Sequence, residues 1–264
     1  MKIYSWNMLF RNRELDRAFD FIAHADFDIF CLQEVPEDFL ARLKTLSISL
    51  NYHSDFIAFR TDVDRLFKRG TERNYVVILS KHPIVAQGEI PFPDYWPLLP
   101  LRTRIFVTLA WPFYFSRISN RGGVFADVNV NGVSVRIFNL HLILAHPTWR
   151  LKEFETAMAE RDPSRPTIVC GDFNILESRH IAPLNWLLGG KMSDALLHRR
   201  ERTNIQQRFV EHQLVNPLAG GITHRVSQSQ LDHILVSHSF IIKKAEVLPD
   251  RIGSDHHPIR VEIA

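Results

Sequence analysis

Two short polar clusters in the second half of the chain offer the side chains that hydrolysis of a phosphate ester requires. The segments 171–174 (Gly-Asp-Phe-Asn) and 254–258 (Ser-Asp-His-His-Pro) each lie beside an apolar run. Glu34 and His141 also follow apolar runs. Carboxylates, amides and imidazoles at strand ends can hold a divalent cation, activate water and meet the charge of a phosphoryl group. This pattern indicates metal-assisted attack on a phosphate ester.

The segment 171–174 follows a run with the composition of a buried strand. Gly171 permits a tight exit from that strand. Because residues two apart in an extended segment face the same side, Asp172 and Asn174 are expected to point together while Phe173 turns into the core. One side chain can accept a proton or orient water, and the other can donate to a phosphoryl oxygen. The alternative is an Asx turn that merely ends the strand.

Glu34 and His141 each have a functional and a structural interpretation. A carboxylate at a strand end suits Mg²⁺, which binds through one or two carboxylates and keeps several waters. Glu34 could instead be an acid favoured by the dipole of a helix that begins at Pro36. Alternation places His141 on the same face as Asn139. A lone histidine is otherwise a surface residue or a hydrogen-bonded core residue.

Asp232 lies inside the apolar run 231–236, where a carboxylate is costly unless it is paired. His256 is a candidate partner, since a carboxylate that holds an imidazole raises its basicity and selects its tautomer. That arrangement suits a general base that activates water. His233 and His257 are expected to be structural, because alternation turns each away from its neighbour.

The elements that position these residues follow from hydrophobic periodicity. Helices are expected at 13–25, 36–46 and 148–161. Strands are expected at 2–7, 28–32, 75–80, 124–130, 133–140, 166–170, 231–237 and 259–263. Asn131-Gly132 between two alternating runs predicts a hairpin, so part of the sheet is antiparallel. We therefore expect an α/β (α+β) fold with mixed sheets covered by helices, rather than a doubly wound parallel sheet.

Bulk properties restrict the possible organisation. The chain has 264 residues, of which 45% are apolar and 23% are charged, a composition typical of globular proteins. A single domain over 1–264 is expected, because one constellation from Asn7 to His256 uses both ends of the chain. The net charge of +3 does not by itself indicate a polyanionic partner. Cys31 and Cys170 in apolar runs fit a reducing compartment, and with no signal-peptide pattern at the start a cytoplasmic location is expected.

The stretch 91–121 matches no regular pattern. It is dense in proline and aromatic residues, and we expect an insertion or a long loop. Arg102 and Arg104 interrupt its apolar run, and Pro100 and Pro112 break it. A spanning helix needs about 20 mostly apolar residues without such charges. No stable membrane insertion is expected.

Six motifs together resemble the endonuclease/exonuclease/phosphatase superfamily, which has the deoxyribonuclease I-like fold. In chain order they are 5–7 (Ser-Trp-Asn), 32–35 (Leu-Gln-Glu-Val), 139–142 (Asn-Leu-His-Leu), 171–174, 231–234 (Leu-Asp-His-Ile) and 254–258. No single motif is specific, but six in the family order cover nearly the whole chain. The resemblance implies a four-layer sandwich of two packed mixed β-sheets flanked by helices.

The resemblance also implies a metal site. Glu34 would be the main Mg²⁺ ligand, with Asn7 close by and Asp255 contributing. Mn²⁺ is a possible substitute for Mg²⁺. Such a cation neutralises the phosphate and polarises its P–O bonds.

Catalytic roles follow by position in the same way. His256 would be the general base, or the imidazole that polarises the phosphate, held by Asp232. Asp172 would position the attacking water or help to protonate the leaving group. Asn174 and His141 would bind the phosphoryl oxygens. Which of His256 and Asp172 takes the proton is left open.

Shared motifs indicate the reaction rather than the substrate, because the superfamily cleaves DNA, RNA, poly(A) tails, inositol phosphates, sphingomyelin and tyrosyl-DNA links. A nuclease needs cations that track phosphates and aromatic rings that stack on bases. Arg73, Arg102 and Arg104 are expected to bind the substrate, and the further candidates are Lys68, Arg69, Arg117 and Arg121. Ordinary surface charge is the alternative for these residues. We expect a Mg²⁺-dependent phosphodiesterase or nuclease that acts on nucleic acid.

Two other functions stay open. Exposed aromatic residues of 92–115 beside arginines could seat a lipid headgroup, as in bacterial sphingomyelinases, or the site could take an inositol phosphate. A non-catalytic binding module on the same fold is the third possibility. The intact set of acids, amides and imidazoles argues against it. The oligomeric state is not predicted.

Overall fold

The computed structural model describes residues 1–58, 72–110, 117–119, 121–193 and 200–264. The strands are β1 (Lys2–Asn7), β2 (Ile29–Pro36), β3 (Ser49–Ala58), β4 (Glu72–Ser80), β5 (Ile84–Pro91), β6 (Arg117–Ser119), β7 (Gly122–Val130), β8 (Val133–His141), β9 (Thr167–Asp172), β10 (Leu214–Val215), β11 (Asp232–Ser237), β12 (Ile242–Val247) and β13 (Ile259–Ile263). The helices are α1 (Leu15–His24), α2 (Glu37–Leu43), α4 (Leu101–Ala110), α5 (Pro147–Ala159), α6 (Ala182–Leu187) and α8 (Arg200–Glu211). Two 3₁₀ turns are η1 (Trp96–Leu98) and η2 (Arg179–Ile181).

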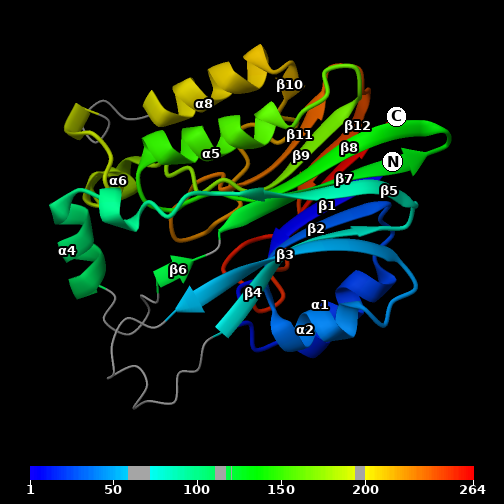
Figure 1. The fold of residues 1–264 in the computed structure, drawn as a ribbon, viewed down its shortest axis with the longest axis horizontal. Helices are drawn as coiled ribbons and strands as arrows, with labels where there is room; N and C mark the ends of the chain where they lie inside the picture. The colour runs from blue at the N-terminus through cyan, green and yellow to red at the C-terminus, as the bar shows by residue number, and fades with distance from the viewer. Residues whose placement is uncertain (59–71, 111–116, 120, 194–199) are drawn as a thin grey trace.

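Two packed sheets form the centre of the molecule, and helices cover their outer faces (Figure 1). One sheet has seven strands in the order β12-β13-β1-β2-β4-β3-β6, and the other has six in the order β10-β11-β9-β8-β7-β5. Helices α1 and α2 cover the first sheet, and α5 and α8 cover the second. In both sheets one parallel pair lies among antiparallel pairs. The predicted four-layer sandwich of two mixed sheets is confirmed.

Most predicted elements are present with shifts of a few residues at their ends. The Asn131-Gly132 hairpin joins β7 and β8, and both of its residues have positive φ, as a type I′ turn requires. Strands β3, β5 and β12 were not predicted. Each carries polar or charged residues along its length, such as the Ile-Lys-Lys-Ala-Glu-Val of β12, so the apolar alternation that marks a half-buried strand is weak there.

The stretch 91–121 is not a bare loop among its described residues. It contains η1, α4 and β6. Pro100 does not break the helix but stands directly before it, where proline is tolerated, and its carbonyl accepts the Arg104 N–H at 3.0 Å. The aromatic residues 111–115 lie outside the described part of the chain. Within that part, every helix is too short or too polar to span a bilayer.

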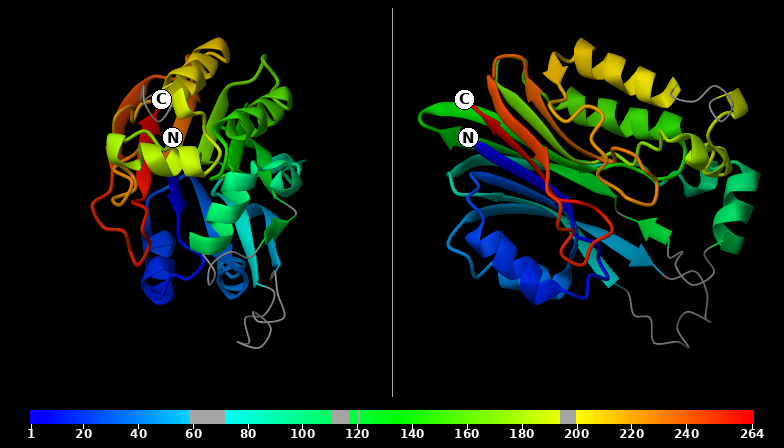
Figure 2. Two further views of the ribbon diagram at one scale, coloured as in Figure 1. Left: turned by 90° about the vertical axis from the view of Figure 1, so that its left-hand side faces the viewer. Right: turned by 180° about the vertical axis from the view of Figure 1, so that it is seen from behind.

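The sheet topology brings the polar strand ends to one edge. Strands β1 and β2 run parallel with Asn7 opposite Gln33, and β8 and β9 run parallel with His141 opposite Asp172. Strand β11 runs antiparallel to β9, so its first residue, Asp232, also lies opposite Asp172. The two termini lie side by side at the far end of the sheets (Figure 2). The motif residues therefore meet although they are far apart in sequence.

A polar link crosses the apolar interior between the sheets. The fully buried Asn139 of β8 donates its amide to the carbonyls of Leu32 (2.9 Å) and Val77 (2.8 Å) in the facing sheet. Its oxygen accepts the Gln33 amide at 2.7 Å. The surrounding core is hydrocarbon and sulfur, and it includes the buried free thiols of Cys31 and Cys170. These three hydrogen bonds join the two sheets next to the polar edge.

Replacing Asn139 should destabilise the whole fold. Asn139→Leu leaves two backbone carbonyls and the Gln33 amide in the interior without their hydrogen-bond partners. We therefore expect the free energy of unfolding to fall by about 2–4 kcal/mol. Urea denaturation measures this change. The control is Val133→Thr at an exposed position of the same strand, which should change stability by less than about 0.5 kcal/mol. Equal stability of Asn139→Leu and the wild type would contradict the structural role of the link.

Candidate active site

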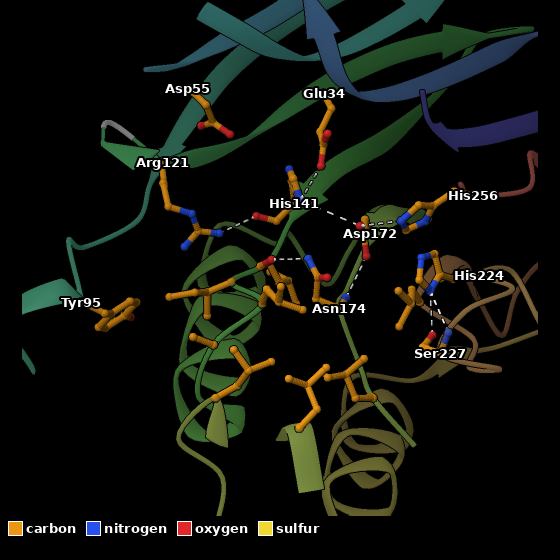
Figure 3. Close-up of a pocket in the computed structure, with 18 of the residues that line it drawn as sticks. Glu34, Asp55, Tyr95, Arg121, His141, Asp172, Asn174, His224, Ser227 and His256 are labelled. Atoms are coloured by element: carbon orange, nitrogen blue, oxygen red, sulfur yellow. Dashed lines mark hydrogen bonds and ion pairs between the residues drawn. The ribbon is translucent and has the colours of Figure 1, made fainter. Parts of the chain in front are cut away.

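A pocket of about 460 Å³ opens at the edge where the polar strand ends meet (Figure 3). One wall of this pocket is polar. Its side chains are those of Glu34, Asp55, Arg121, His141, Asp172, Asn174, His224, Asp255 and His256. Six of them were predicted as site residues from the sequence. The other two predicted residues of the cluster, Asn7 and Asp232, hydrogen-bond directly to members of this wall.

Glu34 occupies an irregular point of β2. The pairing of β2 with β4 shifts register between Leu32 and Val35, and Glu34 has a φ of 55°, which few non-glycine residues adopt. Bulges of this kind re-aim a side chain beside a functional site. The carboxylate of Glu34 is thereby directed into the pocket, where its Oε2 accepts the Phe10 N–H at 3.2 Å.

Asp172 leaves β9 directly after a required glycine. Gly171 has a φ of 139°, and a Cβ there would lie 1.8 Å from the Leu140 carbonyl oxygen of the neighbouring strand. Asp172 Oδ1 accepts the Asn174 N–H at 2.8 Å, which is the Asx turn considered as the structural alternative. The other oxygen, Oδ2, faces the site and accepts the Asn7 amide at 2.9 Å. The turn and the site geometry therefore use different oxygens of one carboxylate.

Asn7 is placed as a donor between two carboxylates. Its Nδ2 lies 3.2 Å from Glu34 Oε1 and 2.9 Å from Asp172 Oδ2. Its Oδ1 accepts the Leu9 N–H at 3.1 Å. This network leaves the amide oxygen engaged with the backbone. Asn7 thus positions the two carboxylates through its Nδ2, and its Oδ1 keeps one lone pair beyond the Leu9 hydrogen bond, so its predicted place beside the cation stays a prediction.

The two predicted catalytic imidazoles carry different charge at neutral pH. Burial alone would lower the pKa of His256, but the carboxylates of Asp232 and Asp172 outweigh it and raise that pKa to about 10. His256 Nδ1 lies 2.8 Å from Asp232 Oδ2, and Nε2 lies 3.8 Å from Asp172 Oδ2. Burial lowers the pKa of His141 to about 4. His256 is therefore a cation and His141 a neutral imidazole, whose Nε2 lies 3.8 Å from Asp172 Oδ2.

Carboxylates of this wall suit a hard divalent cation. The side chains of Glu34 and Asp255 line the pocket and stay partly open to solvent. Burial raises the pKa of Glu34. In Asp255 burial acts in the same direction, but the hydrogen bond with His224 and the charges of His256 and His224 together outweigh it and lower the pKa. Carboxylate oxygens that leave room for water are the donor set that Mg²⁺ takes. The residues present fit such an ion.

Two groups of three side chains in the described ranges also bring possible ligand atoms within 4.8 Å of one another. They are His224, Asp255 and His256, and Asp172, Asp232 and His256. In the second group His256 is already hydrogen-bonded to Asp232, so its imidazole is committed to that carboxylate. Glu34 belongs to neither group, and its predicted metal role rests on its place in the pocket wall.

Sequence reasoning missed Asp55 and His224. Asp55 lies on the unpredicted strand β3, and its Oδ1 is buried with no hydrogen-bond partner among the described residues. Burial raises the pKa of Asp55 to about 7. His224 lies 3.5 Å from Asp255 and packs beside the His256 ring. No alternation or strand end marks either residue, so only the folded chain shows that they belong to the pocket.

The three arginines predicted to bind substrate do not line this pocket. Arg73 is exposed on β4, and Arg102 donates to the Gly190 carbonyl at 2.7 Å while it covers the Trp186 ring. Arg104 lies on α4 and is not among the lining residues. Arg121, one of the further candidates, does reach the pocket, where it is ion-paired with the buried Glu153. Lys68 and Arg69 lie outside the described residues, as does the side chain of Arg117.

The two histidines expected to be structural stay out of the pocket lining. The Nδ1 of His233 lies 3.0 Å from the Leu231 carbonyl, and the Nδ1 of His257 lies 2.8 Å from the Leu248 carbonyl. Both rings are therefore held by backbone oxygens, which is consistent with the structural role expected for them.

Comparisons with known proteins agree with this geometry. A family model described as "Endonuclease/Exonuclease/phosphatase family" matches residues 4–256. A family protein from Leptotrichia buccalis has 18% identity and a TM-score of 0.66, with 100% of this chain and 99% of that chain covered. A Bacteroides thetaiotaomicron mannosyl-6-phosphatase has 19% identity and a TM-score of 0.58, with the same coverage. The 3′ phosphatase NExo from Neisseria, bound to a product DNA hairpin, has 21% identity and a TM-score of 0.57, again with 100% and 99% covered.

A search with the sequence among curated proteins found no match. The three solved structures named above are all below 25% identity, so they indicate only the fold. The family assignment therefore rests on the family model, and the site assignment rests on the side chains described above.

Neutralising Asp232 should lower the pKa of His256. An opposite charge at this range contributes about 1–3 units, so Asp232→Asn should lower the pKa of His256 by that amount. Nuclear magnetic resonance titration of the imidazole in EDTA measures it, with the exposed His238 as an internal reference. In the wild type the stabilisation from this pair is complete below pH 6.5 and is lost as the pH rises towards about 10. An unchanged titration of His256 in the variant would contradict the pairing.

Asp55 should make stability depend on pH in the opposite sense to an ordinary ion-paired carboxylate. Its pKa is raised from 3.8 to about 7, so the folded state loses stability as the pH rises through that interval. Asp55→Asn should therefore gain up to about 4 kcal/mol over the wild type between pH 4 and pH 8. Denaturation at both pH values measures the difference. The exposed Asp20→Asn serves as the control and should follow the wild type, and parallel curves for all three proteins would contradict the assignment.

Proposed function

The chain belongs to the endonuclease/exonuclease/phosphatase family and is a phosphoesterase of that family, and on this premise we propose that it hydrolyses a phosphodiester with the help of Mg²⁺. One observation carries the proposal. Glu34, His141, Asp172, Asn174, Asp255 and His256 come from four separate segments of the chain and converge on one wall of one pocket. A packing role would not require acids, amides and imidazoles to face the same cavity.

We assign the residues to steps of water attack on phosphorus. His256 lies within 4.0 Å of the carboxylates of Asp232, Asp172 and Asp255, so it is held as a cation that donates from Nε2 to a phosphoryl oxygen. Asp172 accepts a proton of the attacking water through Oδ2 as the water oxygen bonds to phosphorus. The bond from phosphorus to the ester oxygen breaks in the same displacement, and the leaving alkoxide takes a proton from solvent water. A fixed donor such as His256 Nε2 stabilises the negative charge that develops on the equatorial phosphoryl oxygens during water attack.

Two further residues of the wall orient the phosphate. The Asn174 side chain is held in place because its Nδ2 donates a hydrogen bond to the Leu142 carbonyl at 2.9 Å. The neutral His141 presents Nε2 between Glu34 and Asp172. A bound Mg²⁺, held by Glu34 and Asp255, would neutralise the phosphate and polarise its P–O bonds. A phosphoryl group bound beside these side chains would meet donors from two sheets.

The nucleic-acid substrate expected from the sequence is one candidate among several kinds of phosphate ester. The Neisseria relative was solved with DNA, whereas the Bacteroides relative is named for a mannosyl phosphate, so the relatives support no single substrate. Of the candidate cations whose side chains are described, Arg121 alone lines the pocket, and it is already ion-paired. The cytoplasmic location and the single domain over 1–264 likewise remain proposals.

Hydrolysis should depend on His256 and Asp172 together with a metal. In the presence of Mg²⁺, His256→Gln and Asp172→Asn should each reduce kcat/KM on bis-p-nitrophenyl phosphate by at least about 10²–10³-fold. The matched control is His257→Gln, because that neighbouring imidazole faces the Leu248 carbonyl instead of the pocket. It should retain nearly full activity.

Two outcomes would overturn this mechanism. Near-normal turnover by either site variant, with the fold intact by circular dichroism, would remove the catalytic assignment. Full activity in EDTA would remove the metal from the mechanism.

A further inference from the structure

The pocket has a second wall that the proposed chemistry does not use. Six apolar side chains line it: Leu144, Leu176, Ile181, Leu184, Leu188 and Leu231. We call this part of the pocket the apolar chamber. Figure 3 shows carbon-only side chains opposite the labelled polar residues. The chamber and the phosphate-binding wall are therefore two sides of one cavity.

The two walls are joined through the chain itself. Asn174 of the polar wall is two residues from Leu176 of the chamber, and both line the cavity. Leu231 directly precedes Asp232, the partner of His256. The two walls line one continuous cavity, so a group bonded to a phosphate at the polar wall would extend directly into the apolar chamber.

The chemistry of the chamber selects against a polynucleotide. Its six side chains carry no polar atom, so base edges and successive phosphates would lose their hydrogen bonds to water there without replacement. An apolar group would gain free energy, because both its own surface and that of the chamber leave water. A cavity of about 460 Å³ is within the range of pockets that enclose small organic ligands.

We propose that the apolar chamber binds the hydrophobic part of an amphiphilic phosphate ester, whose phosphate lies at the polar wall. The proposal rests on the proposed function for the position of the phosphate. It narrows the substrate class to esters of hydrophobic alcohols and makes nucleotides poor ligands.

Such an ester can be dissolved in water or held in a membrane. The exposed surface of α4 is relevant to which of these two sources supplies it. Its inner residue Phe106 packs against the side chains of the chamber. Its outer residues Leu101 and Leu109 are 65% and 73% exposed, and the half-exposed Ile105 lies between them at helical spacing. An exposed apolar stripe beside the chamber is a surface that an aggregated lipid can cover.

The test compares two phosphonates that the enzyme does not hydrolyse. Calorimetric titration with Mg²⁺ present measures the affinity for methylphosphonate and for octylphosphonate. Each buried methylene contributes about fourfold in affinity, so burial of four gives a preference for octylphosphonate on the order of 10²-fold. Thymidine 5′-phosphate, which carries a polar base, should bind no tighter than methylphosphonate.

Substitutions in the apolar chamber test whether the preference for octylphosphonate arises there. Leu184→Trp fills the chamber and Leu184→Gln adds polarity at similar volume, so each should reduce the preference at least tenfold. If one of them fails to fold, the other still carries the test. The matched control is Val210→Trp on α8, which is 67% exposed and outside the pocket lining, and it should leave the preference unchanged.

The outcomes separate this proposal from the proposed function. Equal affinity for the two phosphonates, or a preference that survives in both Leu184 variants, overturns the chamber proposal even if phosphodiesters are hydrolysed. A preference without hydrolysis of any ester supports the chamber and overturns the proposed function alone.

Cosedimentation with phosphatidylcholine vesicles then distinguishes an ester held in a membrane from one dissolved in water. Binding that is lost in the Leu101→Ser/Leu109→Ser double variant assigns the ester to membranes, and protein left in the supernatant assigns it to a dissolved amphiphile.

Discussion

The active-site geometry depends on a buried amide contact between the two sheets. Gln33 of one sheet and Asn139 of the other meet at 2.7 Å, and Asn139 also holds two carbonyls of the facing sheet. Glu34 follows Gln33, and His141 lies two residues beyond Asn139. Apolar burial between the sheets is non-directional, whereas hydrogen bonds have narrow distance and angle preferences. The amides thus align the sheets so that their polar ends face one another.

Charge in the site is set by what surrounds each imidazole rather than by residue type. His256 and His141 are both buried, and burial disfavours the cation in each. His256 has Asp232 in direct contact, and its pKa lies about six units above that of His141. The resulting pair, one cation and one neutral ring, provides two kinds of donor beside Asp172. Groups whose environments drive their pKa values apart can take different catalytic roles.

The two walls of the pocket have different structural origins. Strand ends and the turns that follow them build the polar wall, so its positions are tied to sheet register. The connection after β8, the segment around α6 and the residue before β11 build most of the apolar chamber. Connections can change without disturbing a sheet. The polar wall is therefore tied to the sheets, whereas the apolar chamber depends mainly on connections that can vary within one fold.

The sequence by itself determined the fold class, the polar strand ends and the partner of the buried Asp232. These follow from local alternation, from six motifs in a known order, and from the cost of an unpaired acid in an apolar run. Only the tertiary structure decided that the Asn7 amide donates to the two carboxylates, that Asp55 and His224 join the pocket, and that an apolar chamber lies opposite the polar wall. It also placed Arg73, Arg102 and Arg104 outside that lining. Strand order and strand register bring these distant residues together. Neither can be predicted from the pattern of polar and apolar residues along the sequence.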